Sequence, residues 1–395
     1  MAKIGIFGGS FNPPHRGHIL AVEEFRRKLS LDRVLLIPAA IPPHKSLSSN
    51  SPSGAHRLEM TRLAVKHLPW AEVSDIELRR EGPSYTADTV EQLRKEFPAD
   101  ELYLLMGTDM FFSFGRWRDP QRITKEASLV AAYRCAEDQS RIESHGQQLA
   151  AEFSAKIHYL TNDYLPYSST SVRAMIAFGC AEEYLSGEVA QYIRDNRLYY
   201  SGRDLRALSF EELSSVSLSL HHPKRVPHVK GCSQTAGELA GHFGADETDA
   251  LRAGILHDVT KILNGEEQLK LCRRYGMMIS DLEQETPKLL HAKTGAAVAR
   301  HVFGENDAVF EAICWHTTGK ADMSKLEKII YLADYVEPNR DFEGVLPLRE
   351  LAYRDLDAAM LLGLQMTVEQ LKARKLKINE HSLAALCFLQ ERKSI

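Results

Sequence analysis

The chain has 395 residues, of which 44% are hydrophobic and 26% are charged, and its formal net charge is -4. This length favours two domains, each large enough to bury its own core. No dense Lys/Arg stripe points to a nucleic acid as partner, and no apolar stretch reaches the length of a membrane span. Six scattered cysteines fit a reduced, cytoplasmic protein. The composition leaves a homo-oligomer open.

Short β-like runs alternate with helical patterns through the first half of the chain. This alternation predicts an α/β fold, a Rossmann-like doubly wound parallel sheet with helices on both faces. Ligands bind at the carboxyl ends of the strands in such sheets. The expected strands are 3–7, 33–38, 71–78, 101–106, 128–134 and 155–161, and the expected helices include 17–29, 56–68 and 87–97.

The stretch "FGGSFNPPHRGH" (7–18) follows the first expected strand. Gly8 and Gly9 let the backbone turn sharply and approach a ligand closely. His15 and His18 then lie near a helix start, where free N–H groups and the helix dipole favour an anion. The alternatives are structural capping and a metal site, but no carboxylate or cysteine accompanies the two histidines in this turn. We therefore interpret the pair as phosphate-binding.

A second candidate phosphate site is "YSSTSVR" (167–173), which follows the last expected strand and opens a helix. Ser169 and Thr170 offer hydroxyl groups at the helix start, and Arg173 lies about one turn further on. By itself the stretch could equally be an ordinary capped helix with an exposed arginine. Together, the two stretches suit a long polyphosphate such as a triphosphate.

The HxGH and SSTxxR patterns resemble the nucleotidylyltransferase superfamily. The fuller strings "GGSFNPPHRGH", "IPAAIPPHK", "HRLEMTRLA", "SYTADTVEQLR" and "MGTDMFFSFGRWRD" are similar to bacterial nicotinate-nucleotide adenylyltransferases. The resemblance implies that AMP is transferred from ATP, bound with Mg²⁺, to nicotinate mononucleotide. The products are then deamido-NAD and pyrophosphate, and the attack on the α-phosphorus is direct.

The same resemblance implies a set of site residues. The catalytic residues are His15, His18 and Arg173, with Ser169 and Thr170 holding the triphosphate. For Trp117, whose indole would stack on the nicotinate ring, packing in the core is an equally good reading. The substrate-binding residues expected overall are Gly8, Gly9, Ser10, Phe11, Lys45, Thr86, Gly107, Asp109, Trp117, Ser169 and Thr170. Among them, Gly107 and Asp109 are expected at the adenosine, and Lys45 and Thr86 at the pyridine nucleotide.

The α/β rhythm ends near residue 200, within 198–206. We therefore predict domains at 1–202 and 203–395, the second one all-helical. Apolar residues recur there at three- and four-residue spacing, which is typical of amphipathic helices. The helical segments expected are 228–243, 246–258, 290–303, 324–336 and 355–371.

Single polar residues recur in apolar settings on these separate helical segments. An isolated buried histidine is more often a hydrogen-bonded core residue than a ligand, but burying so many titratable groups without a shared purpose is costly. Four histidines and two aspartates suit two divalent ions, with iron, manganese or zinc as candidates. The set is His228, His257, Asp258, His291, His316 and Asp334. We expect the nearby His221 and His222 to be surface or linker residues.

The order H…HD…H…H…D resembles the HD-domain phosphohydrolases, and "WHTTGKADMSKLEKIIYLADYVEPNRDF" resembles the bacterial YqeK type. This resemblance implies symmetrical cleavage of diadenosine tetraphosphate to two ADP at a di-iron centre. It implies that the six residues are metal ligands, with Asp258 as the bridge between the two ions. It also implies that Lys261 contacts a substrate phosphate; the alternative for Lys261 is a solvated lysine at a helix end. The alternatives are hydrolysis of another nucleotide and a ligand-sensing module that regulates the first domain.

Overall fold

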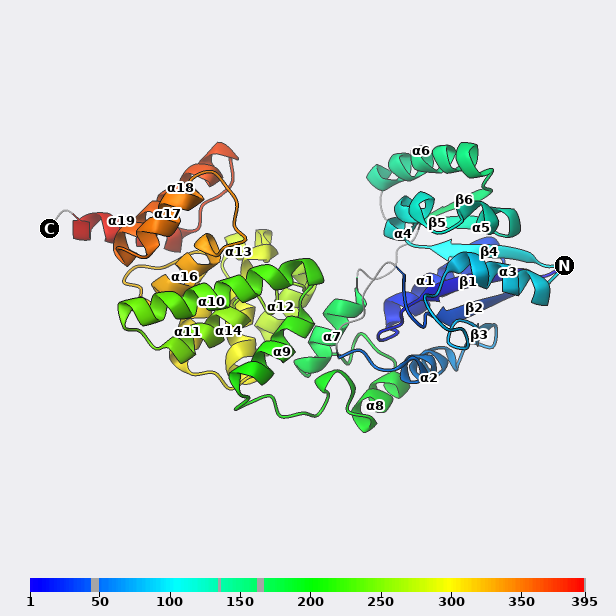
Figure 1. Ribbon diagram of the computed structural model, residues 1–395, viewed down its shortest axis with the longest axis horizontal. Coiled ribbons are helices and arrows are strands. Elements are labelled where there is room, and N and C mark those ends of the chain that lie inside the picture. Colours follow the sequence, from blue (N-terminus) through cyan, green and yellow to red (C-terminus); the bar gives the residue numbers. More distant parts are fainter. Residues whose placement is uncertain (44–49, 134–135, 162–166, 394–395) are drawn as a thin grey trace. The chain divides into compact units, whose positions relative to one another are not determined.

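A computed structural model describes residues 1–43, 50–133, 136–161 and 167–393 of the chain (Figure 1). It divides into two compact units, Met1–Arg203 and Asp204–Ile395. In the described part of the chain, no helix is both long and apolar enough to cross a membrane.

The N-terminal unit is built on one six-stranded sheet in the order β3-β2-β1-β4-β5-β6, with every neighbouring pair parallel. This doubly wound sheet confirms the predicted fold class. The chain order reverses between β1 and β4, so the carboxyl ends of these two strands flank the place where such sheets bind ligands. The strands are β1 Lys3–Gly9, β2 Arg33–Pro38, β3 Ala71–Val73, β4 Glu101–Met106, β5 Ser128–Tyr133 and β6 Ile157–Thr161.

Helices cover both faces of the sheet, because successive strand residues point to opposite faces and both sets are apolar. On one face, Leu35 and Ile37 of β2 join a core with α3, α5 and α6; on the other, Val34 and Leu36 join a core with α1 and α2. The helices of this unit are α1 Arg16–Leu29, α2 Gly54–Val65, α3 Thr86–Glu96, α4 Thr108–Ser113, η1 Phe114–Arg116, α5 Pro120–Glu126, α6 Ala136–Phe153, α7 Ser169–Ala177, α8 Gly187–Asp195 and η2 Leu198–Tyr200.

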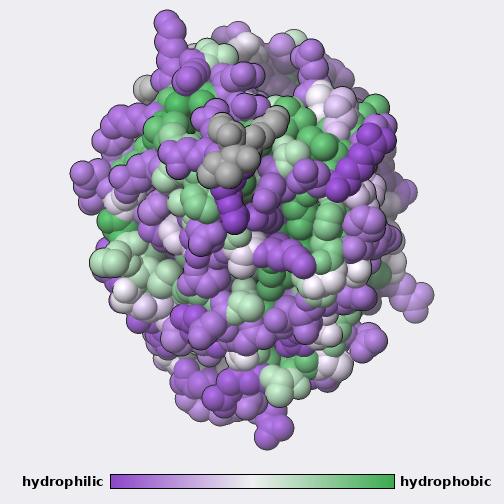
Figure 2. Space-filling model, turned by 90° about the vertical axis from the view of Figure 1, so that its left-hand side faces the viewer, coloured by the Kyte–Doolittle hydropathy of each residue, from purple (hydrophilic) through white to green (hydrophobic). Residues whose placement is uncertain are grey.

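The regular elements described in the C-terminal unit are all helices, as predicted, and α10 packs against both α11 and α16. Hydrophobic residues on the face seen in Figure 2 are broken up by hydrophilic ones. The helices are α9 Phe210–Leu220, η3 Pro223–Arg225, α10 Val226–Phe243, α11 Glu247–Leu256, α12 Gly265–Arg274, α13 Asp281–Glu285, η4 Pro287–Leu289, α14 Leu290–His301, α15 Asp307–Trp315, α16 Lys325–Val336, α17 Val345–Ala352, α18 Leu356–Ala373 and α19 Glu380–Lys393.

Candidate active sites

The turn from β1 into α1 places the two predicted histidines against each other. His15 is the N-cap residue of α1, and its backbone N–H donates to His18 Nδ1 at 3.1 Å. The two imidazole rings are stacked with their centroids 3.6 Å apart. A Cβ added at Gly8 would meet no atom within 4 Å, so the missing side chain leaves open space at the end of β1. A ligand can approach the backbone there.

Burial controls the charge of His15. Its side chain is 6% exposed, and its Nδ1 is buried with no partner among the described residues. Burial and the neighbouring His18 both hold the pKa of His15 well below its usual range. His15 is therefore neutral at pH 7 before an anion binds, and its imidazole can act as a hydrogen-bond donor without the cost of a buried charge.

The predicted second phosphate site joins the first one directly. Helix α7 begins after a Ser168 cap, and its Arg173 is 8% exposed. The Arg173 guanidinium donates to Asn12 O at 2.8 Å, to Ser169 O at 3.2 Å and to Thr170 Oγ1 at 3.2 Å. Ser169 Oγ donates to Pro13 O at 3.2 Å. The HxGH turn and the SSTxxR helix, more than 150 residues apart, are thus held together.

The remaining predicted residues of this unit lie in more varied places. Gly107 is the N-cap residue of α4, and Asp109 is exposed in its first turn, at the end of β4 beside β1. Thr86 begins α3 and is half-buried. Lys45 lies outside the described residues.

Two predicted residues have side chains in the core. Trp117 is 8% exposed, packs on Phe114 and donates from Nε1 to Ser113 Oγ at 3.1 Å, which matches the packing alternative. Its stacking on a nicotinate ring stays a prediction. Phe11 is buried against Phe7, so any contact of Phe11 with a substrate would come from its backbone.

Arg57 is a residue of this site that the sequence reasoning missed. It is 1% exposed, and it donates from Nη1 to Ser10 O at 2.8 Å and from Nη2 to Ala40 O at 3.2 Å. Arg57 therefore ties together the segments that follow β1 and β2. A signal existed, because Arg57 stands at helical spacing with the buried Met60 and Thr61 on the inner face of α2.

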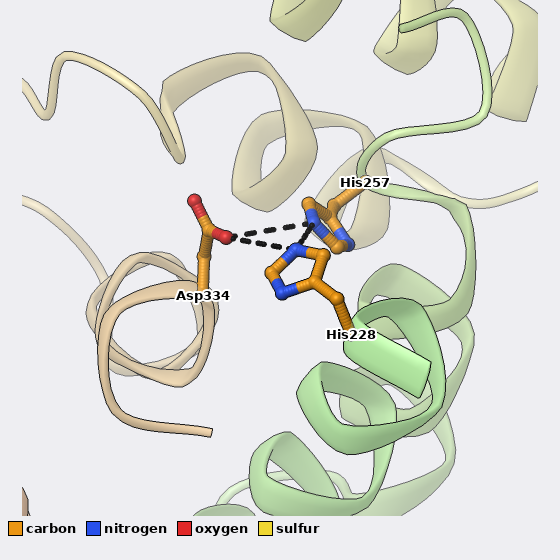
Figure 3. A group of neighbouring side chains, drawn as sticks. All are labelled: His228, His257 and Asp334. Carbon is orange, nitrogen blue, oxygen red and sulfur yellow. Dashed lines mark hydrogen bonds and ion pairs between the residues drawn. The ribbon is translucent and has the colours of Figure 1, made fainter. Parts of the chain in front are cut away.

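In the C-terminal unit, separate helices bring the predicted metal ligands to one point. Figure 3 shows His228 from α10, His257 at the end of α11 and Asp334 from α16 pointing toward one another. His228 Nε2 lies 3.2 Å from Asp334 Oδ1 and 3.3 Å from His257 Nε2. These three ligand atoms form one group that could hold a metal ion, and His257, Asp258 and His316 form another.

Asp258 lies between two pairs of histidines. Its Oδ2 is 3.2 Å from His257 Nε2 and 3.6 Å from His228 Nε2. Its Oδ1 is 3.3 Å from His291 Nε2 and 3.8 Å from His316 Nε2. Each carboxylate oxygen thus faces one pair, as a carboxylate that bridges two ions would require.

The hydrogen bonds of the histidines fix which ring nitrogen faces this centre. Nδ1 donates to Gly254 O in His257 (2.7 Å), to Lys288 O in His291 (2.6 Å) and to Ile313 O in His316 (2.7 Å). A backbone carbonyl only accepts, so Nδ1 carries a proton in each of these rings, and Nε2 is the nitrogen that faces Asp258. Imidazole and carboxylate donors of this kind fit divalent transition-metal ions.

Electrostatics also suits a cation at this centre. Burial lowers the pKa of His291 to about 4 and that of His316 to about 3, which keeps both rings neutral. Burial alone would raise the pKa of Asp258, but the adjacent His257 and His228 hold it well below its usual range. Asp258 is therefore an anion. Burial alone would lower the pKa of His228 and of His257, but neighbouring groups that include the Asp258 carboxylate raise both above their usual value.

Three cations surround the carboxylates, and only one of them was predicted. Lys261 Nζ lies 3.2 Å from Asp258 Oδ1, so this lysine faces the centre rather than being merely solvated. Arg225 pairs with Asp258 Oδ2, and Arg340 Nη2 lies 2.5 Å from Asp334 Oδ1. Both arginines are partly exposed and lie within six residues of a predicted ligand, but that spacing alone did not show that they turn inward.

The expectation that His221 is a surface or linker residue is wrong. The side chain is 4% exposed, and burial lowers its pKa to about 3. Helix α9 ends at Leu220, and the turn that follows leads into the start of α10, where Arg225 and His228 reach the centre. His222, by contrast, is exposed and accepts from Lys224 N.

Comparison with known families assigns a class to each half of the chain. A cytidylyltransferase-like family model matches residues 6–175, and an HD domain model matches residues 225–339. Both resemblances seen in the sequence, to the nucleotidylyltransferases and to the HD domain, are thereby confirmed.

Individual relatives narrow the first assignment. The chain is 40% identical, over 198 residues, to a probable nicotinate-nucleotide adenylyltransferase of Dictyoglomus thermophilum, and 35% identical, over 198 residues, to one of Borreliella burgdorferi. Each alignment covers 50% of this chain and 99% or 96% of the relative. The chain therefore belongs to the nicotinate-nucleotide adenylyltransferase family and carries an additional HD domain.

A solved structure aligns with a similar share of the chain. It is a protein of Clostridium acetobutylicum described as an HD superfamily hydrolase involved in NAD metabolism, with 35% identity and a TM-score of 0.46. The alignment covers 47% of this chain and 98% of the other.

Proposed function

We propose that the chain is a bifunctional enzyme. The N-terminal unit transfers AMP from ATP to nicotinate mononucleotide, which gives deamido-NAD and pyrophosphate. The C-terminal unit hydrolyses diadenosine tetraphosphate to two ADP at a centre of two divalent ions. For the second activity, the observation that carries the proposal is the position of Asp258, which has one carboxylate oxygen toward each pair of histidines.

In the adenylyl transfer, a phosphate oxygen of nicotinate mononucleotide attacks the α-phosphorus of ATP, and the bond to the pyrophosphate leaving group breaks. Catalysis then depends on positioning and on charge stabilisation. His15, His18 and Arg173 supply donors within one connected network, because Arg173 is bonded to the HxGH turn through Asn12 O. Mg²⁺ enters this reaction with ATP and neutralises phosphate charge.

In the hydrolysis, His228, His257, Asp258, His291, His316 and Asp334 would hold the ions, which supply a Lewis acid and an activated water. Iron is our first candidate, and manganese and zinc have compatible ligand preferences. Lys261, Arg225 and Arg340 add three positive charges beside the two carboxylates. A substrate that carries several phosphates matches this excess of cations better than an uncharged one.

A nucleotide panel tests the hydrolytic half. Anaerobically purified protein is assayed for metal content and for cleavage of diadenosine tetraphosphate, nucleoside mono-, di- and triphosphates, and deamido-NAD. We expect two metal ions per chain and two ADP per diadenosine tetraphosphate. If the protein cleaves another nucleotide but not diadenosine tetraphosphate, that nucleotide replaces it as the proposed substrate. If the protein hydrolyses none of these compounds, a ligand-sensing role is favoured.

A further inference from the structure

One of the four histidines at the metal centre has a different hydrogen-bond partner from the others. His257, His291 and His316 donate from Nδ1 to backbone carbonyls, whereas His228 Nδ1 lies 3.1 Å from Glu337 Oε1, a carboxylate oxygen. A carboxylate draws the Nδ1 proton more strongly than a neutral carbonyl does and leaves more electron density on Nε2. His228 should therefore be the strongest donor of the four.

The Glu337 carboxylate is fixed in this position. It is fully buried, and its second oxygen, Oε2, accepts from the backbone N–H and the side-chain amide of Asn339, both at 2.8 Å. The same amide of Asn339 donates to Pro227 O at 3.2 Å, next to His228. The loop after α16 is thereby bonded to the first turn of α10.

Helix α10 leaves space for this carboxylate. A Cβ added at Gly231, three residues after His228, would lie only 2.3 Å from Glu337 Oε2. Any larger residue at position 231 would push the carboxylate away from its place. The glycine is needed because the buried Glu337 side chain, directly after α16, occupies that volume.

We propose that Glu337 is a positioning residue that makes the two metal positions unequal. The position formed by His228, His257 and Asp334, with Asp258 Oδ2, holds its ion more tightly than the position formed by Asp258 Oδ1, His291 and His316. Glu337 does so by orienting the His228 ring and strengthening its Nε2 as a donor. This inference rests on the dinuclear centre of the proposed function.

The test is a titration of the full chain, stripped of metal by a chelator, with Mn²⁺ alone, followed by electron paramagnetic resonance of the free ion. Wild type should bind two ions with different affinities. Glu337→Gln keeps the size of the side chain but removes its charge, and should weaken the tighter position about 10–100-fold while leaving the weaker one unchanged. Glu327→Gln, a buried carboxylate of α16 that pairs with Lys320, is the matched control.

Gly231→Ala is a second test, because it displaces the Glu337 carboxylate without replacing Glu337 or any candidate metal ligand. It should reproduce the selective loss, whereas Gly241→Ala on the same helix, whose Cβ would meet the exposed Glu247 side chain, should not. The inference is overturned if Glu337→Gln and Gly231→Ala leave metal binding unchanged or weaken both positions equally. Two bound ions would still support the dinuclear centre in that case. Fewer than two ions in wild type overturns that centre as well.

Discussion

At the scale of single residues, the two candidate active sites place histidine in different surroundings. At the HD centre, each imidazole is oriented by a hydrogen bond at Nδ1 and turns Nε2 toward a carboxylate, as a ligand must. In the HxGH turn, His15 and His18 stack on each other, and His15 Nδ1 is buried without a hydrogen-bond partner among the described residues. The buried His15 is therefore neutral and can donate a hydrogen bond to a phosphate.

The depressed pKa of His15 predicts a pH dependence of stability in the N-terminal unit. In the unfolded chain His15 has a pKa of 6.5, so below pH 6.5 the unfolded chain binds a proton that folded His15 does not. The contribution of His15 to stability is therefore fully present above pH 6.5 and is lost as the pH falls toward the pKa of folded His15. The loss has a slope of at most about 1.4 kcal/mol per pH unit. Hydrogen exchange of the β1 amides, measured between pH 7 and 5, should show that wild type loses more stability than His15→Asn as the pH falls. The same dependence of stability on pH in both proteins would contradict the prediction.

At the scale of elements, close packing of two helices sets the position of the HD pair. Helix α11 ends at Leu256, directly before His257 and Asp258, so any shift of α11 moves both side chains. Gly254 lies on this helix against α10, and a Cβ there would come within 2.6 Å of Ser233 Cα. Because the neighbour is backbone rather than a side-chain end, it cannot rotate out of the way.

Gly254→Ala should therefore separate α10 from α11 and displace His257 from His228. Overpacking of a core typically costs about 1–3 kcal/mol, and we expect a lowered unfolding temperature of the C-terminal unit together with weaker metal binding. Differential scanning calorimetry and a metal count measure the two effects. Gly241→Ala, which meets only the Glu247 side chain, serves as the control. A stable Gly254→Ala protein with two bound ions would contradict this account.

At the scale of the whole molecule, each unit contains a complete set of candidate catalytic residues. The HxGH and SSTxxR residues lie within Met1–Arg203, and the six metal-ligand candidates lie within Asp204–Ile395. We therefore expect adenylyl transfer to continue when hydrolysis is lost, and hydrolysis to continue when adenylyl transfer is lost.

Two single substitutions test this independence in the full chain. His18→Ala should lower the rate of adenylyl transfer on the order of 10²–10³-fold, the usual effect of removing one donor from a developing charge. It should leave the rate of hydrolysis within roughly two-fold of wild type. His257→Ala should abolish hydrolysis and leave transfer unchanged. Assays of both activities on both variants give the result. A change of transfer kinetics in His257→Ala, without any hydrolytic activity in wild type, would instead indicate a sensing domain.

The amino-acid sequence was enough to predict an α/β first unit and a helical second unit. Parallel strands buried on both faces require apolar runs, and the runs "RVLLIP" and "ELYLLM" became β2 and β4 at the predicted bounds. The alternation of such runs with amphipathic helices gave the doubly wound sheet. Candidate ligand histidines could be proposed in the same way, because a polar residue such as His316 is conspicuous at the end of an apolar helical segment.

The groups that surround those residues became visible only in the folded structure. The partnership of Glu337 with His228 spans 109 positions, and that of Arg173 with Asn12 spans 161. Spacing along one helix carries no information about a contact with another, and hydrogen bonds of this range form only after helices have packed. For the same reason His221 read as a linker residue yet is buried, because burial is a property of the assembled core and not of the local sequence.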